Sequence, residues 1–558
     1  MAPRGDAAYP WAAATGGRRR RCAAALNPRR AAGRIAFLQQ KGRQMVAVTP
    51  TVAPDRADID SSVLAEFGYQ QQLHRKLGPF AAFASGFSFV SILTTVFQLF
   101  AFGFGFAGPA FFWTWPLVFA GQLMVALVFA ELAVRYPISG CIYQWSRRLS
   151  NGVTGWFAGW FMLIGQVVSV AAAAIALQVV LPSIWPGFQV VSGDPALSST
   201  SGATNAVLLG AALITLTTVI NAVGVRVMSL VNSVGVACEI AGVVLLVALL
   251  FGHAERGPSV VTDTGHAGGS GYAMAFLASA LMAAYVMYGF DSAGELAEET
   301  RAPRRTAPRA IIRALVVSGI GGGLLLIAGL MAAPSLTDGN LIAGGLPYVV
   351  TSQLGTSLGR ALLVDVAIAV FVCTLAIQTA ATRLMFSMSR DGVLPFSTRL
   401  ARVNGRTGTP LLPAVVIGVL AVAILLVNVG QGALFTALTS VAVVVVYLAY
   451  LLVTVPVLVR RMRGGWASTV PDGHFGLGRW GLPVNLAAVV FGAFMVVNMA
   501  WPREEVYNPT GGPAYLRYFA GIALAVIVGL GLVAYVARHR RRRPPAAAAA
   551  AAIQGGAS

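Results

Sequence analysis

Twelve long apolar blocks, separated by short polar gaps, constrain this 558-residue chain more than any other feature of its sequence. A helix of about 20 apolar residues crosses the roughly 30 Å hydrocarbon core of a bilayer, rising about 1.5 Å per residue. Each block reaches that length, so we expect an all-α integral membrane protein with twelve transmembrane helices. The blocks span residues 79–106, 114–134, 155–181, 204–223, 230–251, 272–296, 314–333, 359–385, 411–429, 433–458, 482–500 and 516–537.

The positions of the basic residues predict the orientation of these helices. Lys and Arg concentrate in the cytoplasmic loops of membrane proteins. In this chain they fill both ends and every second gap, whereas the opposite side keeps only Arg256, Arg360, Arg503 and Arg517, in the alternate gaps or at the adjoining block ends. We therefore expect both termini to be cytoplasmic. The net charge of +20 could alone suggest nucleic-acid binding. Because the basic residues mark one side of the membrane rather than a phosphate-binding face, we expect no nucleic-acid partner.

Composition divides the chain into three parts. Residues 1–64 form a basic extension without apolar periodicity, and we expect them to be disordered. Residues 65–540 hold the twelve-helix domain, and residues 541–558 form a second disordered tail. Two alternatives for the N-terminus stay open, namely an organelle transit peptide and an over-extended start before Met45.

Signatures of several functional classes are missing from the sequence. No G-x-x-x-x-G-K-[ST] loop occurs, so we expect no ATP-driven motor. The five histidines lie in loops or tails, so we expect no intramembrane metal site and no cofactor. A membrane enzyme would need clustered ionisable side chains within helices, and a channel would need a symmetric pore or a filter ring. A secondary transporter fits better, with a membrane channel as the alternative of another class.

Two blocks, 79–106 and 272–296, carry glycine and hydroxyl residues in their middle. Such residues let a helix unwind, which a membrane tolerates where the backbone lines a cavity. The two blocks open two five-helix halves, 79–251 and 272–458, and interrupted helices at matching positions indicate a midplane binding site. Free amides and carbonyls there suit a zwitterion, although small residues can also serve close packing alone. The candidate substrate-binding residues are Ser85, Gly86, Ser88, Ser91, Tyr285, Tyr288, Gly289 and Asp291.

Three runs carry a resemblance to a known family. They are Gly-Phe-Asp-Ser-Ala-Gly-Glu-Leu-Ala-Glu-Glu-Thr at 289–300, Tyr-Pro-Ile-Ser-Gly at 136–140 and Ser-Arg-Asp-Gly-Val-Leu-Pro at 389–395. Over residues 65–540 the chain resembles the amino acid–polyamine–organocation superfamily, and most of all its amino acid/choline (GABA-permease-like) branch. The resemblance implies a leucine-transporter type of fold, a five-plus-five inverted repeat followed by two C-terminal helices at 482–537. It also implies a permease for amino acids or related small amines, with choline, ethanolamine or a polyamine as alternative substrates.

The resemblance gives the block 272–296 specific roles. Tyr285 falls where related permeases place an aromatic residue that closes over the substrate. Asp291 and Glu295 are spaced to share one face of a helix. Asp291 would either line the pathway or pair with a backbone amide.

The acidic pair that follows this block has a simpler expectation. Glu298 and Glu299 stand close in sequence to Arg301, Arg304 and Arg305. We expect these residues to form a solvated ion-pair cluster at the cytoplasmic surface.

Glu239, within the block 230–251, is the clearest ionisable group at membrane depth. A charged carboxylate is costly there, so we expect a neutral resting form that loads and releases a proton as the cavity opens to either side. Several relatives carry a lysine at the corresponding position, whose ammonium replaces a bound sodium ion; this chain departs from them. The alternative is a structural carboxyl bonded to a hydroxyl such as that of Thr374. A sodium site in this fold needs two hydroxyls where residues 373–376 offer one, so Glu239 and Thr374 are candidates for proton coupling.

These observations predict a multi-pass transporter of the plasma membrane and not an enzyme. It would move an amino acid or related amine by alternating access, as proton-coupled symport or as exchange. Its partners would be the small-molecule substrate, protons and the lipid bilayer.

Overall fold

The computed structural model describes residues 64–542, except for 268, 270, 428, 430–433, 467–469, 471–472 and 509–510. The tails predicted at 1–64 and 541–558 fall outside the described residues, apart from the buried Leu64 and the helical Arg541 and Arg542. Within the described ranges the secondary structure is helical, and the one β-like contact is an isolated bridge between Leu77 and Thr300.

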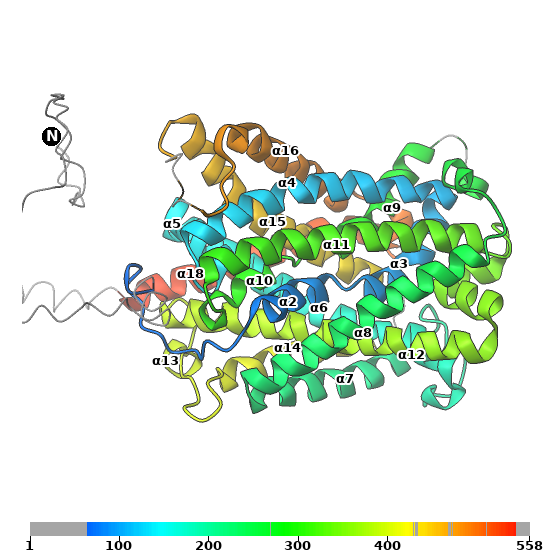
Figure 1. Cartoon of the computed structure of the whole chain (residues 1–558), viewed down its shortest axis with the longest axis horizontal. Coiled ribbons are helices and arrows are strands. Elements are labelled where there is room, and N and C mark those ends of the chain that lie inside the picture. Colours follow the sequence, from blue (N-terminus) through cyan, green and yellow to red (C-terminus); the bar gives the residue numbers. More distant parts are fainter. Residues whose placement is uncertain are drawn as a thin grey trace, which may run out of the picture. The chain divides into compact units, whose positions relative to one another are not determined.

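The helices follow the apolar blocks, with most boundaries shifted by a few residues. In Figure 1, α4 and α11 run beside each other along the long axis of the view. The helices are α2 (Pro79–Val90), α3 (Ile92–Ala107), α4 (Thr114–Arg135), α5 (Cys141–Leu149), α6 (Gly152–Ile184), α7 (Thr200–Val223), α8 (Val225–Gly252), α9 (Tyr272–Val286), α10 (Ser292–Glu295), α11 (Pro303–Ala332), α12 (Gly339–Arg390), α13 (Ser397–Leu400), α14 (Leu411–Val427), α15 (Leu434–Met462), α16 (Gly481–Ala500), α17 (Glu504–Tyr507) and α18 (Phe519–Arg542).

Nine stretches of the described residues are long and apolar enough to cross a bilayer. One of them, Pro79–Arg135, holds two predicted blocks, because only a short 3-10 helix at Gly108–Trp113 separates α3 from α4. Two more apolar helices, α9 and α14, are shorter and match the predicted blocks 272–296 and 411–429. The all-helical, apolar architecture is confirmed, while twelve crossings stay a prediction.

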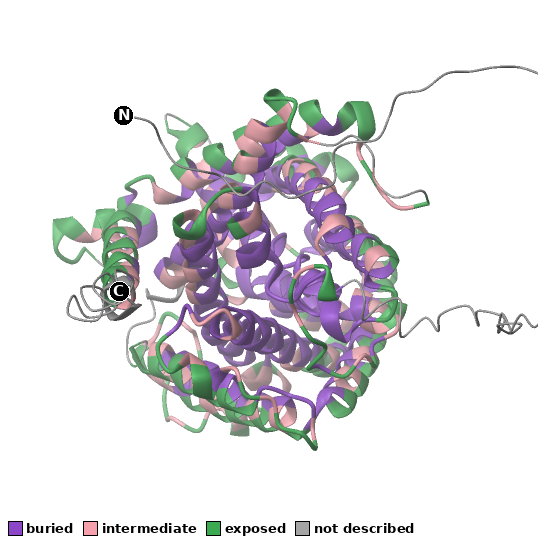
Figure 2. Cartoon of the chain, turned by 90° about the vertical axis from the view of Figure 1, so that its left-hand side faces the viewer, coloured by how far each residue is buried: buried purple, intermediate pink, exposed green. Residues whose placement is uncertain are grey.

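Large apolar side chains cover the outside of the helical unit. Leu230, Val244, Val490 and Val533 are 60–67% exposed. Figure 2 shows the buried residues gathered in the middle and the exposed ones around the rim. Such a rim is stable against lipid tails, whereas a soluble protein rarely exposes so much contiguous apolar surface.

The middle of the unit is built where α6 packs against α12 and α15. Four successive alanines, residues 171–174 of α6, are buried there. Small side chains let membrane helices approach closely. This packing surrounds the two short pairs α2–α3 and α9–α10, which hold the predicted site residues.

Candidate functional site

The first interrupted helix breaks at Ser91, between α2 and α3. Ser91 has φ 36° and ψ 100°, so a single residue divides the predicted block 79–106 into two helices. The hydroxyl of Thr95 donates to the carbonyl oxygens of Val90 and Ser91, at 3.2 and 2.6 Å. It thereby adds a hydrogen bond to the Val90 carbonyl at the end of α2, while the Ser91 carbonyl also accepts from the Thr95 amide at 3.2 Å.

The second interruption lies between Val286, the last residue of α9, and the one-turn helix α10. Gly289 within it has φ +92°, a conformation that side chains rarely adopt. A Cβ atom at Gly289 would lie 1.9 Å from Cδ1 of Phe89 on α2, so the two segments meet across this glycine. The amide of Gly289 donates to the hydroxyl of Tyr450 on α15, at 3.0 Å.

The two interruptions contact each other directly. The hydroxyl of Ser292 on α10 donates to the carbonyl oxygen of Ser85 on α2, at 3.0 Å. A Cβ atom at Gly86 would lie 3.2 Å from the carbonyl oxygen of Phe290. The small residues therefore do permit close packing, and that packing brings the predicted site residues of both helices together.

The remaining candidate side chains are buried beside this contact. The rings of Tyr285 and Tyr288 stand perpendicular with centroids 5.6 Å apart, and the Tyr288 hydroxyl lies 2.6 Å from the hydroxyl of Ser169 on α6. Ser88 is fully buried, and its hydroxyl makes no hydrogen bond within the described part of the chain. The Ser88 hydroxyl is therefore available to hydrogen-bond a substrate.

We expect Ser88→Ala to raise the KM for uptake about two- to tenfold, because one hydrogen bond contributes about 0.5–1.5 kcal/mol. The variant breaks no hydrogen bond of the described protein, so its abundance in the membrane should not change. Initial uptake rates over a range of substrate concentrations measure the effect. Ser279→Ala is the matched control, since the Ser279 hydroxyl already bonds the Phe276 carbonyl within α9. An unchanged KM would remove Ser88 from the site.

Glu239 lies fully buried in α8 and contacts the first interruption. Its Oε1 atom lies 2.8 Å from the Ser91 hydroxyl and accepts from the amide of Leu93 at 3.2 Å. Its Oε2 atom has no hydrogen-bond partner among the described residues. The carboxyl thus bonds one of the predicted substrate-binding residues.

The partner suggested for Glu239 from the sequence is wrong. The Thr374 hydroxyl donates instead to the carbonyl of Val370, one turn back in α12, at 2.8 Å. A different residue of α12, Asp365, brings its carboxyl group to α8, because Gly242 has no side chain to exclude it. A Cβ atom at Gly242 would lie 1.7 Å from Asp365 Oδ2, so this glycine lets the carboxyl rest on the α8 backbone.

The expectation for the acidic pair after α10 is also wrong. Glu298 and Glu299 are fully buried and pair with two arginines of α12. Arg390 binds Glu298 through two nitrogens, at 2.8 and 2.9 Å, and Arg383 binds Glu299 at 3.0 Å. The chain after α10 lies against α12, so Glu298 and Glu299 pair with distant arginines rather than with their neighbours in sequence. One of those neighbours, Arg304, pairs with Glu66 instead.

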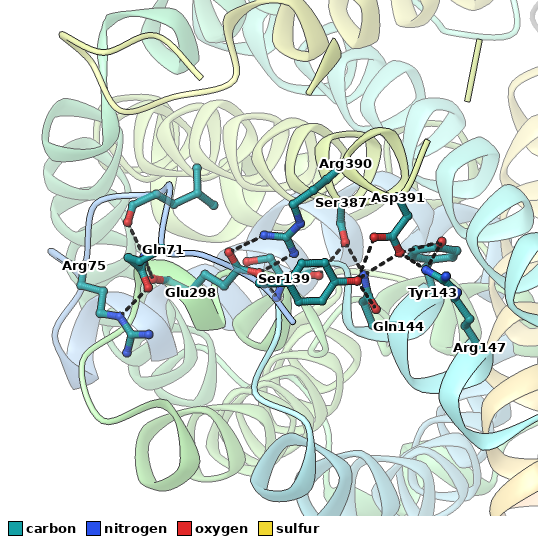
Figure 3. Close-up of polar contacts among 12 residues, drawn as sticks. Gln71, Arg75, Ser139, Tyr143, Gln144, Arg147, Glu298, Ser387, Arg390 and Asp391 are labelled. Carbon is teal, nitrogen blue, oxygen red and sulfur yellow. Dashed lines mark hydrogen bonds and ion pairs between the residues drawn. The ribbon is translucent and has the colours of Figure 1, made fainter. Parts of the chain in front are cut away.

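A wider polar network surrounds the Arg390–Glu298 pair, and we name it the end network (Figure 3). The segment before α2 lies across it, since the Tyr69 hydroxyl donates to Asp391 at 2.8 Å and the Arg390 guanidinium stacks 3.9 Å from the Tyr69 ring. Burial and the Asp391 carboxylate raise the pKa of the Tyr69 phenol, so the hydroxyl keeps its proton at neutral pH. The end network consists of Tyr69, Gln71, Ser139, Tyr143, Gln144, Arg147, Glu298, Ser387, Arg390 and Asp391.

The end network ties α5 to α12. Gln144 of α5 donates to the Ser387 hydroxyl at 3.1 Å, and Arg147 pairs with Asp391. Just before α5, the amide of Ser139 donates to Glu298 at 3.2 Å. Together with the Tyr69 contacts, they join four segments that are far apart in sequence at one end of the helical unit.

Sequence reasoning missed Tyr450, Cys141, Arg383 and Arg390. One signal was available, because Arg383 falls inside the predicted block 359–385. A charged residue within an apolar block needs a partner of opposite charge. The positions of Tyr450 and Cys141 depend on which helices meet, and no local pattern indicates that.

Known proteins resemble this chain over most of its length. A family model described as amino acid permease matches residues 77–531, which contain both interruptions and Glu239. The chain is 27% identical over 509 residues to Amino-acid permease BAT1 of Arabidopsis thaliana, covering 85% of this chain and 94% of the relative. The homolog of that permease in Oryza sativa subsp. japonica is 29% identical over 466 residues, covering 80% and 88%.

The similarity extends to fungi. A protein of Schizosaccharomyces pombe named as an uncharacterized amino-acid permease is 26% identical over 493 residues, covering 84% of this chain and 83% of the relative. The family match, the apolar helices and the two interrupted helices all indicate a membrane transporter. The chain belongs to the amino acid permease family of the amino acid–polyamine–organocation superfamily, and it is therefore a multi-pass membrane transporter rather than an enzyme.

Proposed function

We propose that this permease crosses the plasma membrane twelve times, as two inverted five-helix repeats and two further helices, with both termini in the cytoplasm. The alternation of Arg-rich and Arg-poor gaps supports the orientation. The interrupted helices α2–α3 and α9–α10 begin the two halves, which supports the repeat. In this orientation the end network is cytoplasmic.

The substrate is an amino acid, bound where the two interruptions meet. Backbone groups of residues 287–291, among them the Gly289 amide, together with the Ser88 hydroxyl, suit the ammonium and carboxylate groups of a zwitterion. The relatives named amino-acid permeases support this class. A relative in Macrophomina phaseolina named as an amino acid/polyamine transporter keeps polyamines as an alternative, beside choline and ethanolamine.

Transport proceeds by alternating access, and the structure fits a state that is closed toward the cytoplasm. A cavity of about 280 Å³ is lined by Phe97 and Gln98 of α3, between one and two turns beyond Ser91, and by Gly345 of α12. The end network lies beyond the opposite end of α2. Opening that network while the outer cavity closes would carry the substrate across.

Proton coupling uses Glu239 and the Ser91 hydroxyl. The hydroxyl has one hydrogen and lies 2.8 Å from Glu239 and 2.7 Å from Thr94. When Glu239 is ionised, Ser91 donates to it. When Glu239 is protonated, it can donate to Ser91, whose hydrogen then turns to Thr94. Loading a proton thus reorients a hydroxyl at the first interruption, which supports coupling between the proton and the substrate.

We expect Arg390→Gln to open the cytoplasmic end. The substitution leaves Glu298 buried without its partner, a change that costs about 3–5 kcal/mol in buried pairs. In a chain whose Cys22, Cys238 and Cys373 are replaced by serine, the buried Cys141 should react at least about tenfold faster with a membrane-impermeant maleimide applied from the cytoplasmic side. Arg304→Gln is the control, because its partner Glu66 is exposed and such pairs contribute little. Equal labelling of both variants would contradict the gating role.

Counterflow in proteoliposomes tests the function itself. A carrier loaded with unlabelled amino acid accumulates label transiently, whereas a channel only equilibrates it. Competition of labelled uptake by neutral and basic amino acids, GABA, choline, ethanolamine and polyamines then identifies the substrate. The proposal predicts trans-stimulation by amino acids, and equilibration without trans-stimulation would favour the channel.

A further inference from the structure

Two buried carboxyl groups meet on the cytoplasmic side of the second interruption. Asp291 directly precedes α10 and Glu295 ends it, and neither side chain is exposed. Both face Cys141, the first residue of α5. The Cys141 Sγ atom lies 3.4 Å from Glu295 Oε1, and one oxygen of each carboxyl and the sulfur lie within 4.8 Å of one another.

Each carboxyl has one satisfied oxygen and one that lacks a partner. The Tyr450 hydroxyl donates to Asp291 Oδ1, and the Cys141 thiol donates to Glu295 Oε1. Asp291 Oδ2 and Glu295 Oε2 accept no hydrogen bond from any described residue. These two oxygens can therefore bind a ligand that the surrounding side chains do not supply.

No described basic residue contacts either carboxyl. The acidic groups that follow, Glu298 and Glu299, are already paired with Arg390 and Arg383. The remaining titratable neighbours, the Cys141 thiol and the Tyr450 phenol, act as neutral donors. Two carboxylates this close, without a counter-charge in a low-dielectric interior, do not both ionise.

We propose that Asp291 and Glu295 together bind one proton while the cytoplasmic end is closed, and release it to the cytoplasm when that end opens. The pair is a second proton site, distinct from Glu239, which contacts the first interruption. For its orientation and for the opening step, the inference rests on the proposed function.

The end network explains why release would follow opening. Ser139 stands two residues before Cys141 and is held on both sides, since its amide donates to Glu298 and its carbonyl accepts from the Ser387 hydroxyl at 2.8 Å (Figure 3). These contacts fix the start of α5 over the carboxyl pair. When they break, α5 can leave α10, water can reach the pair, and solvation stabilises the ionised form.

The first test detects the proton without transport. Infrared spectra of the purified full-length permease in lipid are recorded at neutral pH for the wild type and for D291N/E295Q. Their difference should contain the carbonyl stretch of one protonated carboxyl and the bands of one carboxylate. Glu505→Gln is the control, because Glu505 is exposed and its difference should contain carboxylate bands alone. Two carboxylates and no protonated carboxyl at the pair would overturn the proposal.

The same protein distinguishes a proton from a metal ion, since the three facing atoms could also bind a divalent cation. Mn²⁺ is added and binding is followed by electron paramagnetic resonance. We expect the wild type to bind no more Mn²⁺ than D291N/E295Q does. Stoichiometric Mn²⁺ binding by the wild type that the double variant loses would overturn the proposal in favour of a cation site.

A transport measurement separates this inference from the role of Glu239. Substrate exchange is measured in proteoliposomes while the pH on the cytoplasmic side is varied. Acidification should slow the wild type, because the pair keeps its proton, and E295Q should shift the half-effect by at least about one pH unit, a tenfold change in proton concentration. Glu505→Gln, an exposed carboxylate outside the transport site, should keep the wild-type response. If E239Q abolishes the response and E295Q does not change it, the second site is wrong while Glu239 keeps its role.

Discussion

Replacing Gly289 by leucine should abolish uptake while the protein still reaches the membrane. Gly289 has φ +92°, and a Cβ atom there would lie 1.9 Å from the Phe89 ring. A left-handed conformation costs a side chain about 1–2 kcal/mol, and overpacking costs about 1–3 kcal/mol more. Each 1.4 kcal/mol corresponds to about a tenfold loss, so we expect uptake to fall well over tenfold. Initial uptake rates normalised to surface abundance measure it.

Two variants show whether the effect is local. Gly529→Leu in α18 makes the same change where nothing lies within 4 Å of the added Cβ, and it should transport normally. Adding Phe89→Ala to Gly289→Leu removes the facing ring and should restore part of the uptake. Normal transport by Gly289→Leu would mean that the second interruption lies outside the substrate site.

The substitution Glu239→Gln should uncouple transport from the proton gradient. Glutamine keeps the shape of the protonated side chain and can still bond the Ser91 hydroxyl, but it cannot release a proton. With one proton per substrate, each unit of pH gradient supports about a tenfold accumulation. We expect accumulation to fall to equilibration and to lose its pH dependence, while exchange across proteoliposomes persists.

Thr374→Val is the informative companion to this variant. The Thr374 hydroxyl bonds the Val370 carbonyl rather than Glu239, so concentrative uptake should survive its removal. Coupled uptake by Glu239→Gln would rule out Glu239 as the coupling group. Loss of exchange at normal abundance would instead give Glu239 a direct role in substrate binding.

Local sequence was sufficient to predict the interruptions. The glycine and hydroxyl residues around Ser91 and Gly289 weaken a helix by their own backbone preferences, whatever surrounds them. The same holds for the apolar blocks, since their length and composition alone suit a bilayer. Helix existence and approximate bounds therefore followed from residues close together in the chain.

Pairing between distant residues could not be predicted in this way. Glu298 and Glu299 have three arginines within seven residues, yet they bind Arg390 and Arg383, more than eighty residues away. Glu239 bonds Ser91 at the first interruption rather than Thr374. In both cases the partner is set by how the helices cross, and a buried carboxyl takes the donor that packing brings to it.

The Tyr450 hydroxyl joins both halves of the second interruption, because it accepts from the Gly289 amide and donates to Asp291. If a substrate carboxylate takes the Gly289 amide, as the proposed site implies, it displaces the Tyr450 oxygen and so alters the hydrogen bond on Asp291. Binding of substrate and binding of a proton then become thermodynamically linked through one atom. Such linkage is reciprocal: the factor by which substrate changes the affinity for the proton equals the factor by which the proton changes the affinity for substrate. The pH dependence of the substrate Kd, measured at equilibrium with no gradient, would give that factor directly.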